Sequence, residues 1–531
     1  MKKKILLLIL NFSFLILNYS FSQPAIQWQK CFGGSAFDEP NFIRQTSDSG
    51  FIIVGITNSN DGDVSGYHGF NTGNTDCWVV KIDSVGTFEW QKCLGGLNSD
   101  GGSCIKQLND GSYILLASTN SNNDDVSGNH GQNDFWLVKL SSTGAIQWQK
   151  CLGGSRTENP FTVQPTTDGG YILSGSTMSN DGDVSGNHNI NCTTPDYWVV
   201  KVDSVGTIQW QKCLGGVSFD EAGMILEVSN GYIVTGGTMS NDGDVSGNHG
   251  SYDSWLVRLD VAGNIQWSKC FGGSNNDFSN LLYPTNDGGY VLANSTSSND
   301  GDVSGNHDTS SAYSDVWIVK INNIGTIQWQ KCLGGSVADV AKAIQQTTDG
   351  GYLIGAMSFS SDGNINGNHG STDYWIVKLD SASNILWQKC LGGSGFDFFY
   401  SLQQTLDNRY ILAGSTLSTD GDVTGNHGLY DYWVVKLAPD SITGISDLGL
   451  ENLDISIFPN PFTTHATIKF SHQLNAATLR VYNMLGELVV EQRNISGSTL
   501  SITRGNLAGG VYVYEVWDTE YKVCAGKAVV Y

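Results

Sequence analysis

The sequence contains few charged residues, and the two signs are unequal. Asp, Glu, Lys and Arg make up 15% of the chain, and 51 acidic side chains stand against 28 basic ones, for a formal net charge of -23 at pH 7. Such an excess of negative charge repels the phosphates of nucleic acids. We therefore expect no nucleic-acid partner, and the composition suits an extracellular protein.

Long apolar runs are equally scarce. A basic start at Met1–Lys4 precedes one apolar run, Ile5–Leu17, and a small polar stretch, Ser20–Ser22. This order is typical of a secretory signal peptide, and the run is too short to span a membrane comfortably. We predict a signal peptide over residues 1–22. We expect no transmembrane helix in the mature chain, because no second apolar run follows.

Catalytic signatures are missing. The chain has no nucleophile elbow, no HExxH motif and no Gly-rich phosphate loop. Repeated Gly-Gly pairs follow predicted strands but open no helix, so they do not indicate a dinucleotide site. Helical periodicity is absent from the repeat region. Segments rich in Val, Ile, Tyr and Trp instead alternate with turns rich in Gly, Asn, Asp and Ser, which predicts an all-β fold.

What the chain does contain is a repeat. Each unit of about 60 residues holds four strand-length phrases bounded by turns. Four short antiparallel strands per unit are the signature of a β-propeller blade. The most regular phrase is IQWQKC, first seen at Ile26–Cys31. Its tryptophan recurs at Trp28, Trp90, Trp148, Trp210, Trp267, Trp329 and Trp387.

Counting the phrases predicts a seven-bladed propeller with a closed ring. The phrase that begins with Tyr or Phe and the phrase that contains Trp-x-Val-Lys or Arg each occur seven times, and the seventh unit ends at Leu437 without an IQWQKC strand. The copy at Ile26–Cys31 precedes the first unit, so we expect it to complete the last blade. An open β-solenoid or another all-β array is the alternative, but a solenoid needs capping units that the sequence does not show.

The chain has 11 cysteines, of which seven occupy the same place in successive phrases. Equivalent positions in neighbouring repeat units usually lie farther apart than the roughly 7 Å that a disulfide allows between Cα atoms. We therefore predict buried thiols at these seven positions. Cys93 and Cys104 are close enough in sequence to form one local pair. The seven repeated cysteines are Cys31, Cys93, Cys151, Cys213, Cys270, Cys332 and Cys390.

A second, smaller domain is predicted after a polar linker. We divide the mature chain into a propeller over residues 23–437, a linker over 438–454 and a C-terminal domain over 455–531. Alternating apolar residues separated by turns in the last segment predict a small Ig-like β-sandwich.

The C-terminal segment also resembles a known family. It carries FPNPF from Phe458, ATIKF from Ala466, LRVYNMLGELV from Leu479 and GGVYVYEV from Gly509. These motifs, in this order, resemble the type A C-terminal sorting domain of the type IX secretion system of Bacteroidetes. The resemblance implies contact with that secretion machinery, and a protein that is secreted or attached to the outer-membrane surface. The repeats resemble uncharacterised propeller repeats in secreted proteins of the same group, which implies a fold and no function.

The long loop between the second and third strands of each unit carries oxygen side chains at regular places. Counted from its first Asp, the loop of the fourth unit has them at positions 1, 3, 5 and 12, with Gly at 6. This resembles the calcium loop of EF-hand-type sites. The loop equally fits a self-bonded turn, in which Asp and Asn accept hydrogen bonds from nearby backbone. The candidate Ca²⁺ ligands are Asp242, Asp244, Ser246 and Asp253, then Asp362, Asn364, Asn366 and Asp373, and then Asp420, Asp422, Thr424 and Asp431.

Two further sets of polar residues recur. A histidine in each long loop either binds a metal, takes part in catalysis or fastens the loop. A carboxylate after each Gly-Gly turn either contributes to an acidic mouth, which would bind a cation or a polyhydroxylated ligand, or caps its own turn. The histidines are His68, His130, His188, His249, His307, His369 and His427. The carboxylates are Asp38, Asp100, Glu158, Asp220, Asp277, Asp339 and Asp397.

Three kinds of function fit these observations. Our first hypothesis is a non-enzymatic secreted or cell-surface propeller that binds a glycan or a cell-surface protein. The second is a hydrolase or lyase that degrades polysaccharide or peptide at the mouth of the channel, and the third is a purely structural surface protein. An enzyme needs a unique polar cluster in one or two blades, because one ring has one centre. The repeats show little asymmetry of this kind beyond Arg156 with Glu158 and insertions in three loops.

Overall fold

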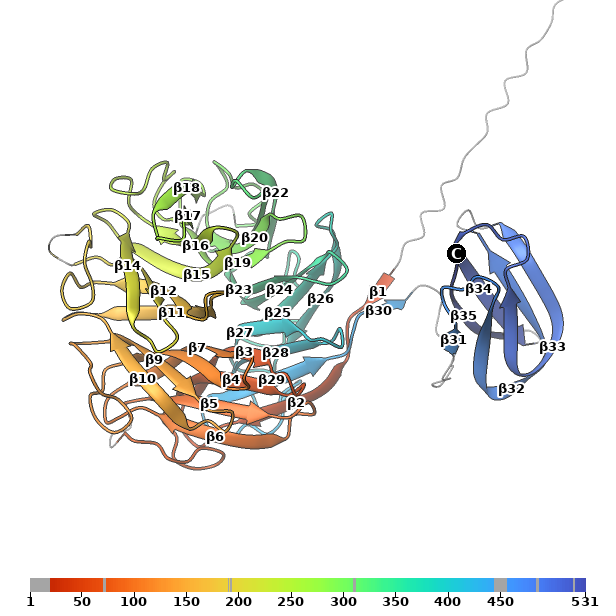
Figure 1. Cartoon of the computed structure of the whole chain (residues 1–531), viewed down its shortest axis with the longest axis horizontal. Coiled ribbons are helices and arrows are strands. Elements are labelled where there is room, and N and C mark those ends of the chain that lie inside the picture. The colour runs from red at the N-terminus through yellow and green to blue at the C-terminus, as the bar shows by residue number, and fades with distance from the viewer. Residues whose placement is uncertain are drawn as a thin grey trace, which may run out of the picture. The chain divides into compact units, whose positions relative to one another are not determined.

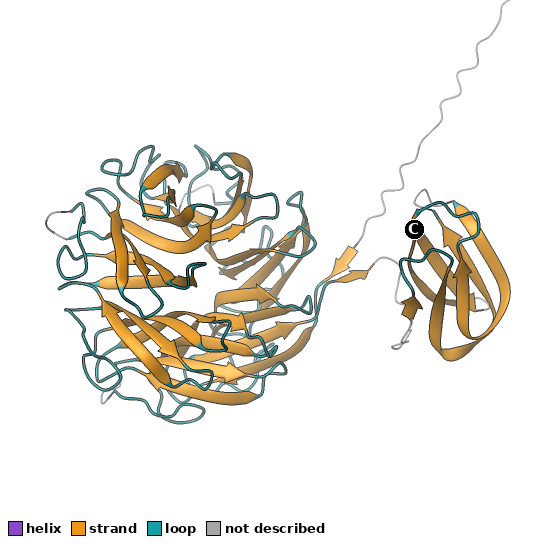
Figure 2. Cartoon of the chain, in the orientation of Figure 1, coloured by secondary structure: helices purple, strands orange, loops and turns teal. Residues whose placement is uncertain are grey.

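The computed structural model describes residues 20–69, 73–189, 191, 193–308, 312–443, 456–483, 487–518 and 521–531. Residues 1–19 of the predicted signal peptide and 444–454 of the predicted linker lie outside these ranges. The chain divides into two compact units, Met1–Ile442 and Thr443–Tyr531. The described residues form strands, turns and loops, and they include no helix that could span a membrane (Figure 2).

The larger unit contains seven four-stranded antiparallel sheets arranged in a ring, which confirms the predicted propeller (Figure 1). The first strands, at the centre of the ring, are β3 (Asp38–Gln45), β7 (Asp100–Gln107), β11 (Glu158–Pro165), β15 (Asp220–Val228), β19 (Asp277–Pro284), β23 (Asp339–Gln346) and β27 (Asp397–Gln404). The second strands are β4 (Phe51–Thr57), β8 (Tyr113–Thr119), β12 (Tyr171–Thr177), β16 (Gly231–Thr238), β20 (Tyr290–Thr296), β24 (Tyr352–Ser358) and β28 (Tyr410–Thr416). The third strands are β5 (Asp76–Ile82), β9 (Asp134–Leu140), β13 (Asp196–Val202), β17 (Asp253–Leu259), β21 (Asp315–Ile321), β25 (Asp373–Leu379) and β29 (Asp431–Leu437). The outer strands are β6 (Phe88–Leu94), β10 (Ile146–Leu152), β14 (Ile208–Leu214), β18 (Ile265–Phe271), β22 (Ile327–Leu333), β26 (Ile385–Leu391) and β2 (Ile26–Phe32).

The N-terminal strand β2 completes the seventh blade, as the repeat count predicts. It pairs antiparallel with β29, from Ile26 opposite Leu437 to Phe32 opposite Tyr432. The sheet order is β2-β29-β28-β27, so β2 holds the outer place that a fourth strand holds in the other blades. Backbone hydrogen bonds thus join the two ends of the ring and leave no blade short of a strand. A two-stranded sheet of β1 (Ser20–Ser22) and β30 (Ser441–Thr443) follows this pair.

Burial of the strands follows their place in the blade. Second and third strands are buried on both faces, and their sequences are accordingly near-continuous apolar runs, such as YILLAST in β8. The tryptophan of each third strand is fully buried and packs on the neighbouring blade, with ring centroids 4.5 Å apart for Trp78 and Tyr432. These tryptophans fill the space between blades. The tryptophan of the outer strand packs on the next blade as well, for example Trp90 on Tyr113 at 6.1 Å.

The repeated cysteines are buried free thiols, as predicted. The local pair of Cys93 and Cys104 is wrong, because both are free and they belong to different apolar clusters. Burial, with a smaller contribution from nearby carboxylates, raises the pKa of Cys151 to about 12. A thiol with so high a pKa is not a nucleophile at neutral pH.

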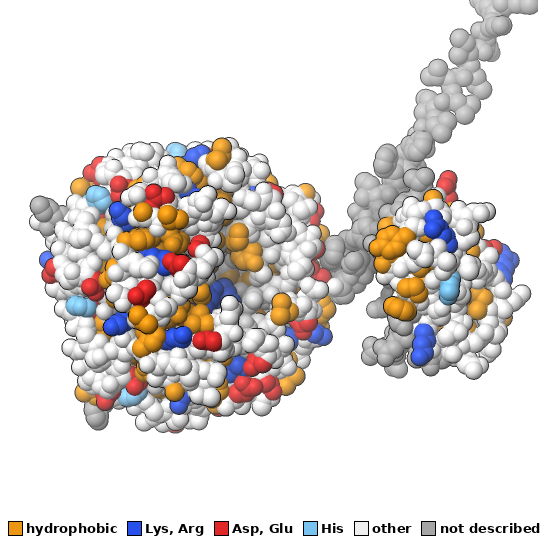
Figure 3. Space-filling model, viewed as in Figure 1, with side chains coloured by type: hydrophobic (Ala, Val, Ile, Leu, Met, Phe, Trp, Pro, Cys, Tyr) orange, Lys and Arg blue, Asp and Glu red, His pale blue; other side chains and the backbone are white. Residues whose placement is uncertain are grey.

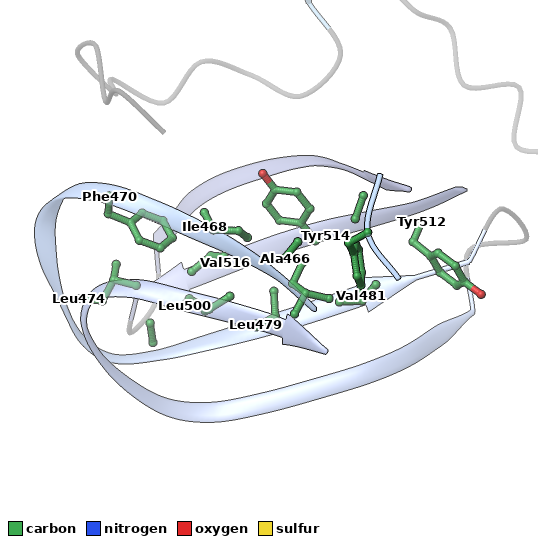
Figure 4. Packing of buried hydrophobic residues seen from close by; sticks show 14 of the residues in the cluster. Ala466, Ile468, Phe470, Leu474, Leu479, Val481, Leu500, Tyr512, Tyr514 and Val516 are labelled. Carbon is green, nitrogen blue, oxygen red and sulfur yellow. The ribbon is translucent and has the colours of Figure 1, made fainter. Parts of the chain in front are cut away.

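The smaller unit is a five-stranded antiparallel sheet folded over on itself, which confirms the predicted small β-sandwich. The long strand β32 pairs with β33 along both of its halves, and irregular register between Lys469 and Leu479 bends the pair. Two layers thereby enclose a core that includes Ile468, Leu479 and Val516 (Figure 4). The strands are β31 (Ser456–Phe458), β32 (His465–Tyr482), β33 (Leu488–Thr503), β34 (Gly510–Asp518) and β35 (Tyr521–Val530).

Candidate functional site

The long loop of each blade is held by its own polar side chains. In the fourth blade, Asp242 accepts a hydrogen bond from the backbone N–H of Val217 at 3.0 Å, and Asp244 accepts one from Gly215 at 3.4 Å. Both donors belong to the Gly-Gly turn of the same blade, so these bonds tie the two loops together. Blades six and seven repeat the arrangement, where Asp362, Asn364, Asp420 and Asp422 accept from Ser336, Gly334, Ser394 and Gly392.

The fifth loop position is bonded to the outer strand instead. The backbone oxygen of Asn366 accepts from Gln388 at 2.9 Å, and that of Ser246 from the thiol of Cys270 at 3.6 Å. Thr424 accepts from Gln29 in the same way. The twelfth positions, Asp253, Asp373 and Asp431, are buried at the starts of their third strands.

These candidate calcium ligands thus have separate protein partners. Among the described residues, no three His, Cys, Asp or Glu side chains come together as a metal site. The hydrogen bonds support the self-bonded turn, and the calcium loop stays a prediction.

Each loop histidine is bonded to the buried aspartate that begins the third strand. His188 Nδ1 lies 2.5 Å from Oδ2 of Asp196, and the backbone N–H of His188 donates to the same oxygen at 2.9 Å. His188 Nε2 lies 3.5 Å from a carboxylate oxygen of Asp244 in the next blade. Burial lowers the pKa of His188, but the hydrogen bond and charge of Asp196 outweigh it, so the net change is upward. The pair recurs in all seven blades, which supports a fastening role for the histidine.

The carboxylates after the Gly-Gly turns do not form an acidic mouth, and that hypothesis is wrong. All seven are buried, with at most 1% of their surface exposed. Asp38 accepts hydrogen bonds from the backbone N–H of Gly34 and the hydroxyl of Ser59, both at 2.8 Å, and from the hydroxyl of Thr57. These carboxylates cap their own turns, which is the other explanation that the sequence allows.

Buried carboxylates nevertheless meet in pairs between neighbouring blades. Asp431 Oδ1 of the seventh blade and Asp38 Oδ2 of the first flank the same point, 2.6 and 2.7 Å from where a Cβ on Gly33 would stand. Asp431 Oδ1 is buried and has no hydrogen-bond donor among the described residues, and the equivalent atom is unpaired in each of the other six blades. Burial raises the pKa of Asp431 to about 6. The negative charge of Asp38 adds a smaller upward contribution to the pKa of Asp431.

The first strands vary more in sequence between blades than the other strands do. Several of their variable residues lie together at one end of the channel. Glu39 on β3 hydrogen-bonds to Tyr400 on β27, and Lys342 on β23 lies close enough to Glu39 to affect its pKa. The Lys342 ammonium is 5.6 Å from the centroid of the Tyr400 ring. Burial raises the pKa of Glu39 and lowers that of Lys342. Among the described residues, this combination of side chains occurs at one place in the ring, at the end of the channel nearest the long loops.

An aromatic group, which we call the aromatic platform, lies beside the polar cluster. It comprises Phe37, Phe396, Phe398 and Tyr430. The rings of Phe398 and Tyr430 stack with centroids 5.6 Å apart and planes 19° apart, and Phe396 stacks on Phe398 at 5.8 Å. Phe37 meets Tyr430 edge-on at 5.3 Å. Phe396 is 38% exposed, and burial together with the charge of Glu39 raises the pKa of Tyr430, which places the platform next to the cluster.

A second aromatic group lies between the fourth and fifth blades, about half-way around the ring from the platform. Tyr252 contacts Phe278 at 4.5 Å and Phe219 at 6.2 Å between centroids, and Phe278 is 47% exposed. Burial raises the pKa of the adjacent Glu221. Figure 3 shows apolar side chains gathered around the centre of one propeller face, with acidic and basic side chains among them.

Repeat counting alone did not find these channel residues. Glu39 and Tyr400 lie at the two ends of the repeat region, and only ring closure brings them together. The sequence does contain a signal for these residues. The phrases of the second, third and outer strands stay nearly constant from unit to unit, whereas the second and fourth positions of the first strand change in almost every unit.

Residues 456–530 match the family model of the secretion system C-terminal sorting domain. The match covers the smaller unit and confirms the resemblance seen in its motifs. The chain therefore carries a sorting domain of the type IX secretion system, which interacts with that machinery. This domain places the protein outside the cell or on the outer-membrane surface.

The chain is also similar to part of the regulatory protein FlaEY of Caulobacter vibrioides, with 28% identity over 183 residues. These residues make up 32% of this chain and 19% of the relative, so the chain spans about a fifth of the length of the curated relative that it matches.

Similar solved structures include a protein of unknown function from Bacteroides caccae, with 12% identity, a TM-score of 0.33, and coverage of 57% of this chain and 87% of that one. Another is a fungal alcohol oxidase of the AA5 family in complex with copper, with 12% identity, a TM-score of 0.43, and coverage of 96% and 99%. Likenesses of this extent carry no argument about function.

Proposed function

We propose that the exported propeller binds a glycan at the end of its channel nearest the long loops, without catalysing a reaction on it. The observation that carries this proposal is the aromatic platform beside the single polar cluster of Glu39, Lys342 and Tyr400. Ligand sites combine apolar and aromatic surface with a few placed polar groups, and this place in the ring has both.

The chemistry of the platform suits a sugar ring. A sugar presents an apolar C–H face and a rim of hydroxyls. The ring of Phe396, which is 38% exposed and stacks on Phe398, offers apolar surface for the face, and the stack of Phe398 on Tyr430 supports it. The carboxyl of Glu39, the ammonium of Lys342 and the hydroxyl of Tyr400 offer acceptors and donors for the rim.

The second aromatic group extends the proposal to a chain of sugars. Phe278 and Tyr252 belong to the blades opposite the platform, so an oligosaccharide that crosses the channel mouth would meet both groups. Affinity should then rise with the number of linked sugars until both groups are reached. A cell-surface protein ligand would show no such dependence on glycan length.

A hydrolase or lyase is the second candidate. The observation that favours it is that burial raises the pKa of Glu39, because an upward shift of this kind is what a general-acid carboxyl requires. Glycoside hydrolysis usually needs a second carboxylate on the other side of the scissile bond. The groups found beside Glu39 are Lys342 and Tyr400, so binding is the better-supported function.

The experiment is a screen of the purified propeller on a glycan array, followed by incubation of each bound polysaccharide with the protein. Binding without release of smaller products supports the proposal. Product release that Glu39→Gln abolishes would replace it with the hydrolase or lyase. Absence of binding to every glycan, by a protein whose melting shows it to be folded, would refute it.

A further inference from the structure

The other end of the channel contains two basic side chains with no acidic partner. Arg44 lies five residues beyond Glu39 along β3, which is about 15 Å at the rise of a strand. Lys106 holds the equivalent place on β7. Both are half-buried and lie over the ring of Phe42, with the Arg44 guanidinium 4.0 Å and the Lys106 ammonium 4.9 Å from its centroid.

The hydrogen bonds of Arg44 leave its charge uncompensated. Arg44 donates to the backbone oxygens of Ile43 at 2.7 Å and Leu402 at 3.3 Å, and to the hydroxyl of Ser401 at 3.3 Å. These acceptors are all neutral. Among the described residues, no carboxylate lies within ion-pair distance of Arg44 or Lys106.

Some buried basic residues of the propeller do have an acidic partner. Four buried lysines at the end of the third strand are each paired with an aspartate of the neighbouring turn, at 2.8 or 2.9 Å: Lys81 with Asp48, Lys201 with Asp168, Lys320 with Asp287 and Lys378 with Asp349. Arg44 and Lys106 differ from these four lysines, because they are two neighbouring cations that share one aromatic ring and have no carboxylate at ion-pair distance.

The position of Lys106 beside Arg44 changes its pKa. Burial and the positive charge of Arg44 lower the pKa of Lys106 to about 8. The ring of Phe42 attracts each cation but does not remove their mutual repulsion. A bound anion would remove it, because an opposite charge favours the protonated amine.

We propose that Arg44 and Lys106 form an oxyanion-binding site at the end of the channel nearest the turns between first and second strands. Its ligand is a sulfate, phosphate or carboxylate group, which a guanidinium and an ammonium recognise through charge-assisted hydrogen bonds. Tyr283 lies close enough to Arg44 to affect its pKa, and its hydroxyl is a further donor. Tyr283 also lines a cavity of about 380 Å³ with Gln345 and Gln403, which lies beside the site and is not lined by Arg44 or Lys106. This site is separate from the proposed glycan site.

The test uses the full-length protein and isothermal titration with sodium sulfate, inorganic phosphate and glucuronate. All three present the same oxyanion chemistry, and the tightest binder identifies its source. Sodium chloride at matched ionic strength is the salt control, because sulfate at high concentration stabilises proteins without a site. The variants are Lys106→Gln and Arg44→Gln, with exposed Lys150→Gln as the matched control.

We expect wild type and Lys150→Gln to bind at least one of the three anions. Lys106→Gln and Arg44→Gln should each weaken that binding by about tenfold or more, because a hydrogen bond to a charged group is lost. Lys106→Gln should also melt at a higher temperature than wild type in chloride, since it removes the repulsion between the two cations.

Binding to wild type should weaken from pH 7 to pH 9 as Lys106, which faces Arg44 and Cys104, loses its proton. Equal binding by all four proteins, or no binding of any of the anions to wild type, would overturn the proposal. If one channel variant fails to fold, the other variant and the pH dependence of wild type still decide. Phe398→Ala should keep the anion site, so this result and that of the glycan screen are independent.

Discussion

Gln29 accepts a hydrogen bond from the indole N–H of Trp433 at 2.8 Å, across 404 residues of sequence. The same bond joins a third-strand tryptophan to a glutamine 13 residues later in five other blades, at 2.8 or 2.9 Å. The N-terminal strand therefore reproduces the side-chain contacts of an ordinary outer strand as well as its backbone pairing. Closure of the ring uses the same interactions as the blades themselves.

Loss of this contact should loosen the closure. Gln29→Ala removes the hydrogen bond from Trp433 and those that Gln29 donates to Thr424, and it should lower the free energy of unfolding by about 1 to 2 kcal/mol. Urea unfolding measures the change, and hydrogen exchange at the backbone of Val434 reports whether β2 separates from β29. Gln211→Ala removes the equivalent bond within the third blade and is the control. We expect similar losses of stability but faster exchange at Val434 in Gln29→Ala alone. Unchanged exchange there would contradict the closure.

The fourth blade lacks this hydrogen bond between tryptophan and glutamine. Ser268 stands where six blades have glutamine, and the buried indole N–H of Trp255 has no hydrogen-bond acceptor in the part of the chain that the structure describes. Ser268→Gln should supply the acceptor and stabilise the propeller by about 1 kcal/mol. The measurement is the midpoint of urea unfolding, with Ser268→Leu as a control that adds apolar volume without an acceptor. An equal gain from both variants would show that packing, not the hydrogen bond, limits this blade.

The buried carboxylate pairs predict an unusual dependence of stability on pH. Burial raises the pKa of Asp76, Asp220, Asp277, Asp339 and Asp431 to about 6 from an ordinary value of 3.8. For such groups the folded state binds the proton more tightly, so their contribution is complete below 3.8 and is lost as pH rises through 6.

A second set of carboxylates acts in the opposite direction at lower pH. The pKa of Asp168 falls to about 2, because the Thr166 hydroxyl, Lys201 and the backbone of Gly170 donate to its carboxylate. Its contribution is present above 3.8 and is lost as pH falls through 2. As the pH is lowered from 7, the melting temperature should therefore rise to a maximum between about pH 4 and pH 5, and it should decrease again below about pH 3. Asp431→Asn should flatten the rise, and a melting temperature that falls steadily from pH 7 to 5 would contradict the raised pKa values of the buried carboxylates.

The long loops predict an outcome for metal removal. Their oxygens accept hydrogen bonds from the protein, so addition of a chelator should leave the melting temperature unchanged. A decrease that calcium restores and magnesium does not would instead favour the calcium loop at Asp242, Asp244, Ser246 and Asp253. Asp244→Asn separates the two explanations, because it keeps an acceptor for Gly215 but lowers affinity for a cation.

The fold could be predicted from the sequence because it follows from counting. Strand phrases recur at regular intervals, and the displaced copy at Ile26–Cys31 implies a ring that closes on Leu437. The burial of individual side chains could not be predicted by counting repeats. Asp38 and its equivalents look like a ring of exposed acids in sequence, yet each is enclosed by the turn that it caps. The polar cluster was missed because it depends on residues that break the repeat, such as Glu39 and Tyr400, and on the ring closure that joins them.

The central claim is that the aromatic platform and its polar cluster bind a glycan. The most direct measurement is the affinity of wild type, Phe398→Ala and Phe88→Ala for the best glycan from the array, by isothermal titration. Phe88 is 37% exposed on the outer strand β6, far from the channel in the blade order, and is the matched control. Phe398→Ala should weaken binding about fivefold to tenfold through loss of ring stacking, with Phe88→Ala equal to wild type. Equal affinities for all three proteins would contradict the claim.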